Sequence, residues 1–118
     1  MDGLRTYSAG SVTWKNMERI HRRKREAVRE CIGIAEQNRN IRRMIIFGSS
    51  VTDFCDENSD LDICLDITGS SKNLEMFNSV ADMSGVCGGE CDILIYDHIA
   101  GPLKKTIDRK GVVVYELS

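Results

Sequence analysis

Long apolar runs are missing from this sequence of 118 residues. No stretch approaches the roughly 20 consecutive apolar residues that a membrane-spanning helix requires, and the N-terminus lacks the apolar core of a signal peptide. We therefore expect a cytoplasmic protein. Internal repeats and low-complexity linkers are missing as well, and a chain of this length suits one domain with a single modest core.

The cysteines offer neither a disulfide framework nor a clear metal site. Their number, five, is odd, and several fall at positions expected in buried strands or helices. Reduced thiols explain this pattern better than a set of disulfides does. Cys87 and Cys91 are close enough in sequence to suggest zinc, but their spacing is loose, and neither a second pair nor a histidine accompanies them. We therefore do not expect a zinc site.

Hydrophobic periodicity and turn residues predict the order of the helices and strands. Residues 1–12 show little periodicity and are expected to form a flexible N-terminal extension or a strand-like arm, followed by a single domain over residues 13–118. The predicted elements are a helix from Trp14 to about Gln37, a strand over Met44–Phe47, a strand that carries Asp60 and Asp62, a helix from Ser70 or Ser71 to about Met83, a strand over Cys91–Tyr96, a helix from Pro102 closed by Gly111, and a strand over Val112–Leu117.

These elements predict an α/β fold of the α+β type, in which a mixed β-sheet has helices packed mainly on one face. The second predicted helix is expected to point four residues toward the core, namely Leu74, Phe77, Val80 and Ala81.

Charge is distributed unevenly along the chain. Residues 1–50 hold eleven Lys and Arg against five Asp and Glu, whereas residues 51–118 hold five against thirteen. The basic half contains the run His21–Arg25, which suits contacts with the phosphates of RNA or of a nucleotide. A solvated helix face, balanced by nearby glutamates, is the simpler interpretation of this run. No aromatic residues interleave with its charges, so the stacking typical of single-strand binders is not expected.

The acidic half contains two aspartates, Asp60 and Asp62, that lie two positions apart on a predicted strand. Successive side chains of a strand point to opposite faces, so both aspartates share one face while Leu61 and Ile63 are buried on the other. Aspartate is disfavoured in strands, and such a conflict with propensity is expected at functional sites. Two carboxylates this close repel each other unless a cation lies between them, and Mg²⁺ prefers carboxylate and phosphate oxygens. The pair therefore predicts a magnesium site.

A turn of small residues, Gly48, Ser49 and Ser50, follows the preceding strand directly. Glycine lets the backbone adopt a positive φ and approach a ligand closely, and the serines supply hydroxyl and amide hydrogens. The turn therefore predicts a phosphate site near the carboxylates.

Together these residues resemble the minimal nucleotidyltransferases, a family within the DNA polymerase β superfamily. The resemblance is carried by the apolar strand, Gly48-Ser49, about ten further residues, and Ser59-Asp60-Leu61-Asp62 followed by an apolar strand. The family pattern then expects a third acid between apolar residues of a later strand, and Asp92 in the segment Cys91–Ile95 supplies it. The resemblance runs from roughly Ile41 to the C-terminus.

The resemblance implies a reaction and a set of site residues. The expected reaction transfers a nucleoside monophosphate, AMP from ATP, to an acceptor hydroxyl and releases pyrophosphate. Asp60 and Asp62 would bridge two Mg²⁺ ions, and Asp92 would complete the ion that activates the acceptor hydroxyl and accept its proton. The nucleotide would be bound by the turn and by the serine of the acidic motif, that is by Gly48, Ser49, Ser50 and Ser59.

The resemblance also implies a partner and leaves alternatives open. Minimal nucleotidyltransferases often pair with a small helical protein of the HEPN type, sometimes as antitoxin to toxin, and modify it with AMP; a homo-oligomer is another option. Many active members carry an arginine where this chain has Ser50, so a catalytically weak or inactive module that binds a nucleotide or a partner is the alternative. A third option is the catalytic piece of a nucleic-acid-modifying assembly that docks through His21–Arg25.

Overall fold

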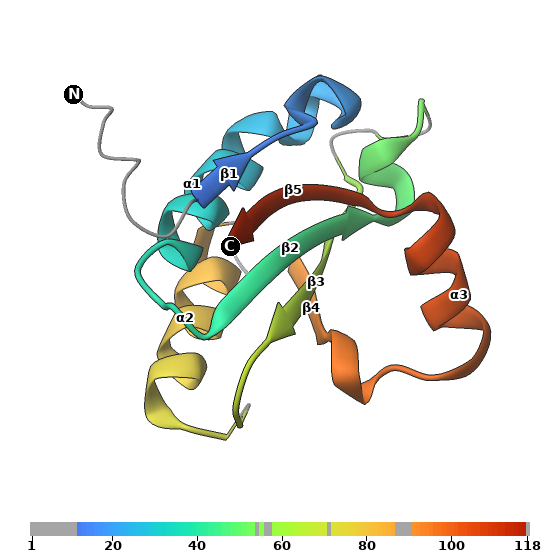
Figure 1. Ribbon diagram of the computed structural model, residues 1–118. Coiled ribbons are helices and arrows are strands. Elements are labelled where there is room, and N and C mark those ends of the chain that lie inside the picture. The colour runs from blue at the N-terminus through green and yellow to red at the C-terminus, as the bar shows by residue number, and fades with distance from the viewer. Residues whose placement is uncertain (1–11, 54, 56–57, 71, 87–90, 118) are drawn as a thin grey trace.

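The computed structural model describes residues 12–53, 55, 58–70, 72–86 and 91–117, which form a twisted sheet with helices on both sides (Figure 1). In chain order the elements are β1 (Val12–Trp14), the 3-10 turns η2 (Met17–Arg19) and η3 (Arg22–Lys24), α1 (Arg25–Ala35), β2 (Ile41–Phe47), η4 (Gly48–Val51), β3 (Leu61–Ile67), α2 (Leu74–Val86), β4 (Cys91–Ile95), η5 (Tyr96–His98), α3 (Gly101–Lys110) and β5 (Val112–Leu117).

The five strands form one mixed sheet in the order β1-β5-β2-β3-β4. Neighbouring strands are antiparallel except for β3 and β4, which run parallel. A parallel pair needs a crossover connection, and α2 supplies it. The parallel register aligns Asp62 with Asp92 and Ile63 with Ile93. The crossover therefore brings together two segments that lie thirty positions apart in the sequence.

The two faces of the sheet are covered unequally. Leu61, Ile63 and Leu65 of β3 are fully buried in a core that also contains residues of α1 and α2. Alternation along the strand places Cys64 on the opposite face, where it packs with Ile45 of β2 and Ile107 of α3. Two helices thus cover one face and α3 covers part of the other (Figure 1), and the predicted fold class is confirmed.

The first helix is shorter than the sequence pattern predicts. Trp14, its predicted first residue, pairs with Tyr115 of β5, and its indole Nε1 donates a hydrogen bond of 2.7 Å to Glu36. Asn16 then adopts a left-handed conformation with φ of 62°, and Ile20 is extended, with ψ of 134°. Pairing with β5 overrides the helical periodicity here, so the prediction of one helix from Trp14 was wrong and α1 begins at Arg25.

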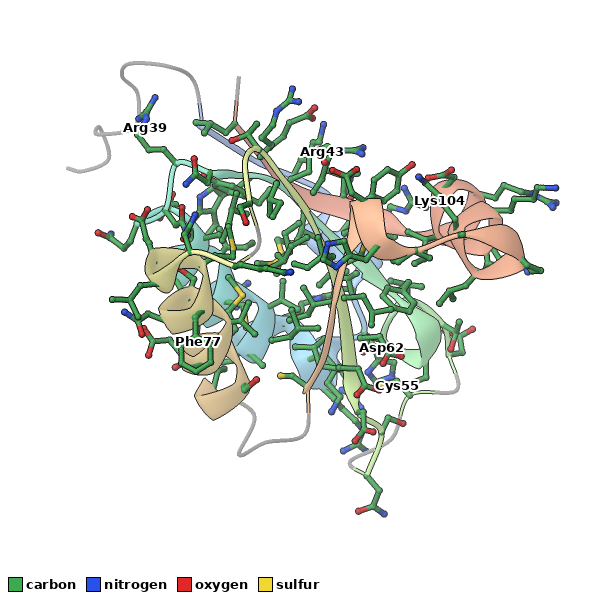
Figure 2. The ribbon with its side chains drawn as sticks, turned by 90° about the horizontal axis from the view of Figure 1, so that it is seen from below. Arg39, Arg43, Cys55, Asp62, Phe77 and Lys104 are labelled. Atoms are coloured by element: carbon green, nitrogen blue, oxygen red, sulfur yellow. The ribbon has the colours of Figure 1, made fainter. Side chains whose placement is uncertain are left out.

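The inward face of α2 also differs from the prediction. Leu74 and Phe77 are 72% and 67% exposed, and Phe77 points away from the sheet in Figure 2. The buried residues of α2 are instead Met76, Ser79 and Met83. The helix begins after Asn73, whose side-chain oxygen accepts a hydrogen bond from the Met76 amide (2.7 Å). That cap fixes a helical phase in which the methionines face the core.

The same phase buries a polar pair between the helices. The amide of Asn38, which follows α1, donates a hydrogen bond of 3.1 Å to the hydroxyl of Ser79. Ala81 is exposed, and Val80 is half-buried against the core. Of the four predicted inward residues, only Val80 therefore packs inward.

The cysteines and the N-terminal segment conform to expectation in part. Cys31, Cys55 and Cys64 are buried free thiols, whereas Cys91 is disulfide-bonded, which corrects the expectation of reduced thiols for that residue. Cys87 lies outside the described residues, as does nearly all of the predicted extension 1–12, of which Val12 belongs to β1. None of the helices in the described part of the chain is long and apolar enough to cross a membrane.

Candidate active site

Neighbouring strands bring two of the three predicted acids together. Asp62 of β3 and Asp92 of β4 are register partners across the parallel pair, and their carboxyl groups are in hydrogen-bonding contact. Asp60 precedes the first residue of β3 and is exposed. The structure therefore contains a close pair, with the third acid next to it.

The pKa of Asp62 reflects this crowding. It is raised from its ordinary value to about 6, chiefly by burial, and further by the charges of Asp92 and Asp60 and by the hydrogen bond with Asp92. Each of these causes disfavours the ionised form of the carboxyl group. Asp62 is thus the acid whose negative charge most needs a compensating cation.

Gly48 forms one wall of the site. It directly follows Phe47, the register partner of Asp62 in β2, and has a φ of 74°. A Cβ atom at this position would lie 2.2 Å from the Oδ2 atom of Asp62. Any other residue at this position would have to displace the carboxylate and adopt a strained φ, and Figure 2 shows Asp62 next to η4.

The three serines of the predicted nucleotide site differ in exposure. Ser49 is half-exposed, and its carbonyl oxygen accepts hydrogen bonds from the Thr52 amide (3.0 Å) and hydroxyl (2.9 Å). Ser50 is fully buried, and its hydroxyl has no hydrogen-bond partner among the described residues. Ser59 is half-buried, and its carbonyl oxygen accepts a hydrogen bond from the ammonium group of Lys24.

The donor set suits a hard divalent cation, although no complete metal centre is formed. Within the described part of the chain, no group of three or more His, Cys, Asp and Glu side chains is arranged to hold a metal ion. Asp62 and Asp92 nevertheless present carboxylate oxygens on adjacent strands, and a cation between them would offset their mutual repulsion. Two carboxylates, completed by substrate phosphates, are what Mg²⁺ usually takes from a protein. The pair therefore fits the ion.

The basic run that the sequence analysis associated with phosphate contacts borders the site. The His21 amide donates a hydrogen bond of 2.7 Å to the carbonyl oxygen of Ser50, and Lys24 binds the carbonyl oxygen of Ser59. The basic run itself was the only signal in the sequence. The sequence did not indicate the position of this run, because the segment is a turn next to η4 and not the middle of a helix.

Asp66, the other acid on this face of β3, is occupied elsewhere. Its Oδ2 atom accepts a hydrogen bond of 2.8 Å from Nε of Arg43, its register partner in β2. The guanidinium of Arg43 also lies 5.5 Å from the ring centre of Tyr96. Asp66 therefore belongs to an ion pair between two strands, away from the Asp62–Asp92 pair.

A match to a known family covers most of the chain. A family model described as polymerase beta, nucleotidyltransferase matches residues 29–118. This span contains the Gly48–Ser50 turn and all three predicted acids. A search of curated proteins found no match.

Several solved structures share the fold. A chain in a toxin–antitoxin structure with AMP-PNP is 13% identical, with a TM-score of 0.61, and the match covers 79% of this chain and 73% of that one. A chain in the complex of a tri-AMPylated HEPN toxin from Shewanella oneidensis with its MNT antitoxin is 12% identical, with a TM-score of 0.58 and coverages of 79% and 72%. A protein described as a minimal nucleotidyltransferase is 20% identical, with a TM-score of 0.56 and coverages of 74% and 92%. At these identities the similarity concerns the fold.

Proposed function

The chain belongs to the polymerase β nucleotidyltransferase family, and on this premise we propose that it transfers AMP from ATP to a hydroxyl group of a protein acceptor. The observation that carries the proposal is the carboxyl pair of Asp62 and Asp92 next to Gly48. A pair of acids on rigid strands beside a turn open to phosphate is the arrangement that metal-dependent transfer to a phosphoryl centre requires.

Each acid has a role in the proposed reaction. Asp60, Asp62 and Asp92 would hold two divalent cations. We propose that these cations are Mg²⁺, which prefers carboxylate and phosphate oxygens. When bound, such a cation neutralises the charge that develops on the phosphate oxygens. The acceptor oxygen attacks the α-phosphorus atom, the bond from that atom to the bridging oxygen breaks, and pyrophosphate leaves. Asp92 accepts the proton of the acceptor hydroxyl.

The nucleotide is held mainly by backbone groups in this proposal. Gly48 and Ser49 bind the phosphates, with Ser59 next to the first acid. Because the side chain of Ser50 is buried, this residue would contact the phosphates through its main-chain atoms. ATP is supported as the substrate by the fold that this chain shares with the protein crystallised with AMP-PNP.

A HEPN-type protein is the acceptor that the similar structures favour. One of them contains a tri-AMPylated HEPN toxin together with an MNT antitoxin. A domain of this size has little surface with which to recognise a large acceptor unaided, so we propose that a stable partner provides the hydroxyl group.

Transfer of radiolabel from ATP tests the proposal. The chain is incubated with Mg²⁺ and ATP labelled at the α-phosphate, in separate reactions with a HEPN-type protein, with RNA and alone. We expect label in protein, and a loss of about a hundredfold or more in rate for Asp62→Asn and for Asp92→Asn. Asp97→Asn, which changes an exposed acid five positions beyond Asp92, is the matched control and keeps the rate.

Three outcomes would contradict the proposal. Incorporation of label from the γ-phosphate would indicate phosphoryl transfer instead. Label in RNA alone would indicate a nucleic-acid acceptor. Binding of Mg²⁺ and ATP without incorporation into any acceptor would favour the alternative, a nucleotide-binding or partner-binding module of the same fold.

A further inference from the structure

The segment His21–Lys24, here called the basic turn, is attached to both ends of the loop that joins β2 to β3. At one end, the His21 amide donates a hydrogen bond to the carbonyl oxygen of Ser50 (2.7 Å). At the other end, the Lys24 ammonium group binds the carbonyl oxygen of Ser59. The turn is closed by its own hydrogen bonds, from the Lys24 amide to the carbonyl oxygen of His21 (2.8 Å) and from the Arg23 amide to Nδ1 of His21 (3.2 Å). The basic turn is therefore held in place beside the predicted phosphate site.

A pocket of about 280 Å³ lies between the basic turn and the residues that follow Ser50. Its wall on one side is formed by Val51, Thr52 and Asp53. Its other side is formed by the segment from Glu18 to Ile20, together with His21, Arg22 and Arg25. The volume is close to the lower end of the range for small-molecule sites, about 300 Å³. It is large enough for part of a nucleotide, such as its terminal phosphates.

The cations of this pocket are not equivalent. Arg25 donates hydrogen bonds to the carbonyl oxygens of Ile20 (2.9 Å) and Glu18 (3.2 Å), so its guanidinium is used within the fold. Arg22 is exposed, and its side chain makes neither a hydrogen bond nor an ion pair with any other described residue. Glu18 and Asp53 also line the pocket and offset part of its positive charge. Arg19 of η2 also lines the pocket and is exposed, with no side-chain partner among the described residues. Of these two cations with free donors, Arg22 is the one in the basic turn, which is hydrogen-bonded to Ser50 of η4.

The proposed substrate needs a cation of this kind. The site already contains three carboxylates, and the β- and γ-phosphates of ATP add further negative charge at its edge. A divalent ion bound by Asp62 and Asp92 cannot cover every phosphate oxygen. A guanidinium presents several N–H donors in a planar fork that matches phosphate oxygens, and it keeps its charge at any physiological pH.

We propose that Arg22 binds the terminal phosphates of ATP in the pocket between the basic turn and Val51–Asp53. This inference rests on the proposed function, because it assumes that ATP occupies the site. It assigns to the basic turn the recognition of a triphosphate in preference to a monophosphate. The segment before α1 then distinguishes nucleotides by the number of their phosphates.

Nucleotide binding to Arg22→Ala tests the inference without need of an acceptor. Titration calorimetry with Mg²⁺ measures the affinity for a non-hydrolysable ATP analogue, for tripolyphosphate and for AMP. We expect the variant to bind the ATP analogue and tripolyphosphate about tenfold to a hundredfold more weakly, and AMP as well as the unaltered chain does. Arg22→Lys keeps the charge without the fork and should lose less.

Arg29→Ala is the matched control. Arg29 is also exposed, and its replacement by alanine removes the same charge. It lies farther along the chain, in α1, where it forms a weak 3.7 Å ion pair with Glu26. We expect its affinities to equal those of the unaltered chain, and equal melting temperatures of the two alanine variants would exclude a folding defect. An equal loss of ATP-analogue and AMP affinity in Arg22→Ala, or no loss at all, would overturn the inference.

The binding results separate this inference from the proposed function. If the unaltered chain transfers AMP but Arg22→Ala binds like Arg29→Ala, only the inference fails. If ATP-analogue binding depends on Arg22 but no acceptor is labelled, only the proposed function fails. If the unaltered chain binds neither the ATP analogue nor tripolyphosphate, both are overturned.

Discussion

At the scale of single residues, the candidate site depends on how closely Gly48 and Asp62 approach each other. The carboxylate oxygen occupies the space that a Cβ atom would need, and the turn has a backbone conformation that other residues rarely adopt. The same carboxylate also interacts with Asp92, its register partner in β4. A substitution at either position is therefore expected to affect both halves of the site.

Replacement of Gly48 by alanine should reduce both stability and ligand binding. We expect a loss of about 1–2 kcal/mol in the free energy of unfolding from the positive φ, and a further loss because the Asp62 carboxylate must move. Gly69→Ala is the control, because Gly69 has a φ of 78° but no atom within 4 Å of the place that a Cβ atom would occupy. Urea unfolding and titration with Mg²⁺ and an ATP analogue measure the two effects. Equal loss of ligand affinity in both variants would contradict the argument.

The stability of the metal-free protein should fall as the pH rises through the pKa of Asp62. The carboxyl group holds its proton up to a pH of about 6 in the folded protein, but only to about 4 when unfolded. The folded state therefore loses stability as the pH rises from about 4 to about 6, stays at the lower level above that range, and regains the stability as the pH falls back toward 4.

Asp62→Asn, which resembles the protonated acid, should accordingly raise the melting temperature at pH 7.5 in the presence of EDTA. Because Asp62 is partly exposed, we expect a gain of less than about 1 kcal/mol, which shrinks toward pH 4. Melting curves across this pH range, with Asp97→Asn as the control, measure it. A variant that is less stable than the unaltered chain at pH 7.5 would show that the ionised Asp62 carboxylate does not destabilise the folded state.

At the scale of elements, two errors of the sequence-based prediction concern helices, namely the start of α1 and the inward face of α2. The pattern before Arg25 is compatible with a helix, but β1 gains backbone hydrogen bonds by pairing with β5. In α2 the apolar residues surround most of the helix, so periodicity alone did not choose its buried face. The cap at Asn73 and the polar contact of Ser79 with Asn38 made that choice.

The two faces of α2 should respond differently to truncation. Met83 is fully buried, so Met83→Ala should cost about 2–5 kcal/mol of unfolding free energy. Phe77 is mostly exposed, so Phe77→Ala should change stability by no more than about 0.5 kcal/mol. Urea unfolding of both variants measures the difference. A larger loss of stability for Phe77→Ala than for Met83→Ala would support the sequence-based prediction that Phe77 faces the core.

At the scale of the whole molecule, binding at the site should stabilise the entire fold. The three acids and the turn come from β3, β4 and the end of β2, which lie side by side in the sheet. A ligand that binds only the folded chain stabilises it by mass action. Ligands that join these strands should therefore protect the protein against thermal unfolding.

We expect Mg²⁺ and an ATP analogue, at ten times the dissociation constant, to add about 1.4 kcal/mol to the stability of the unaltered chain. The double variant Asp62→Asn, Asp92→Asn should show no such gain, and removal of the ion with EDTA should abolish it. Thermal melting with the nucleotide alone, the ion alone and both together separates the contributions. Equal stabilisation of the double variant would place the ligand elsewhere.

Much of the fold and the candidate site could be predicted from local patterns. Six of the predicted helices and strands occur close to their predicted positions, because their apolar periodicity, capping residues and turn glycines act over short distances. The alternation that buried Leu61 and Ile63 and turned Asp62 to the other face follows from strand geometry alone. The family resemblance identified Asp92 in the same way, from a short apolar segment.

The sequence by itself thus determined which residue types are present, which strand carries the acids and which family the chain resembles. Only the tertiary structure decided that Asp62 and Asp92 are register partners, that Ser50 is buried, and that the basic turn lies beside η4. These facts depend on strand pairing and on hydrogen bonds between residues far apart in the chain. No periodicity within one segment encodes such contacts, because they form only when the whole sheet has assembled.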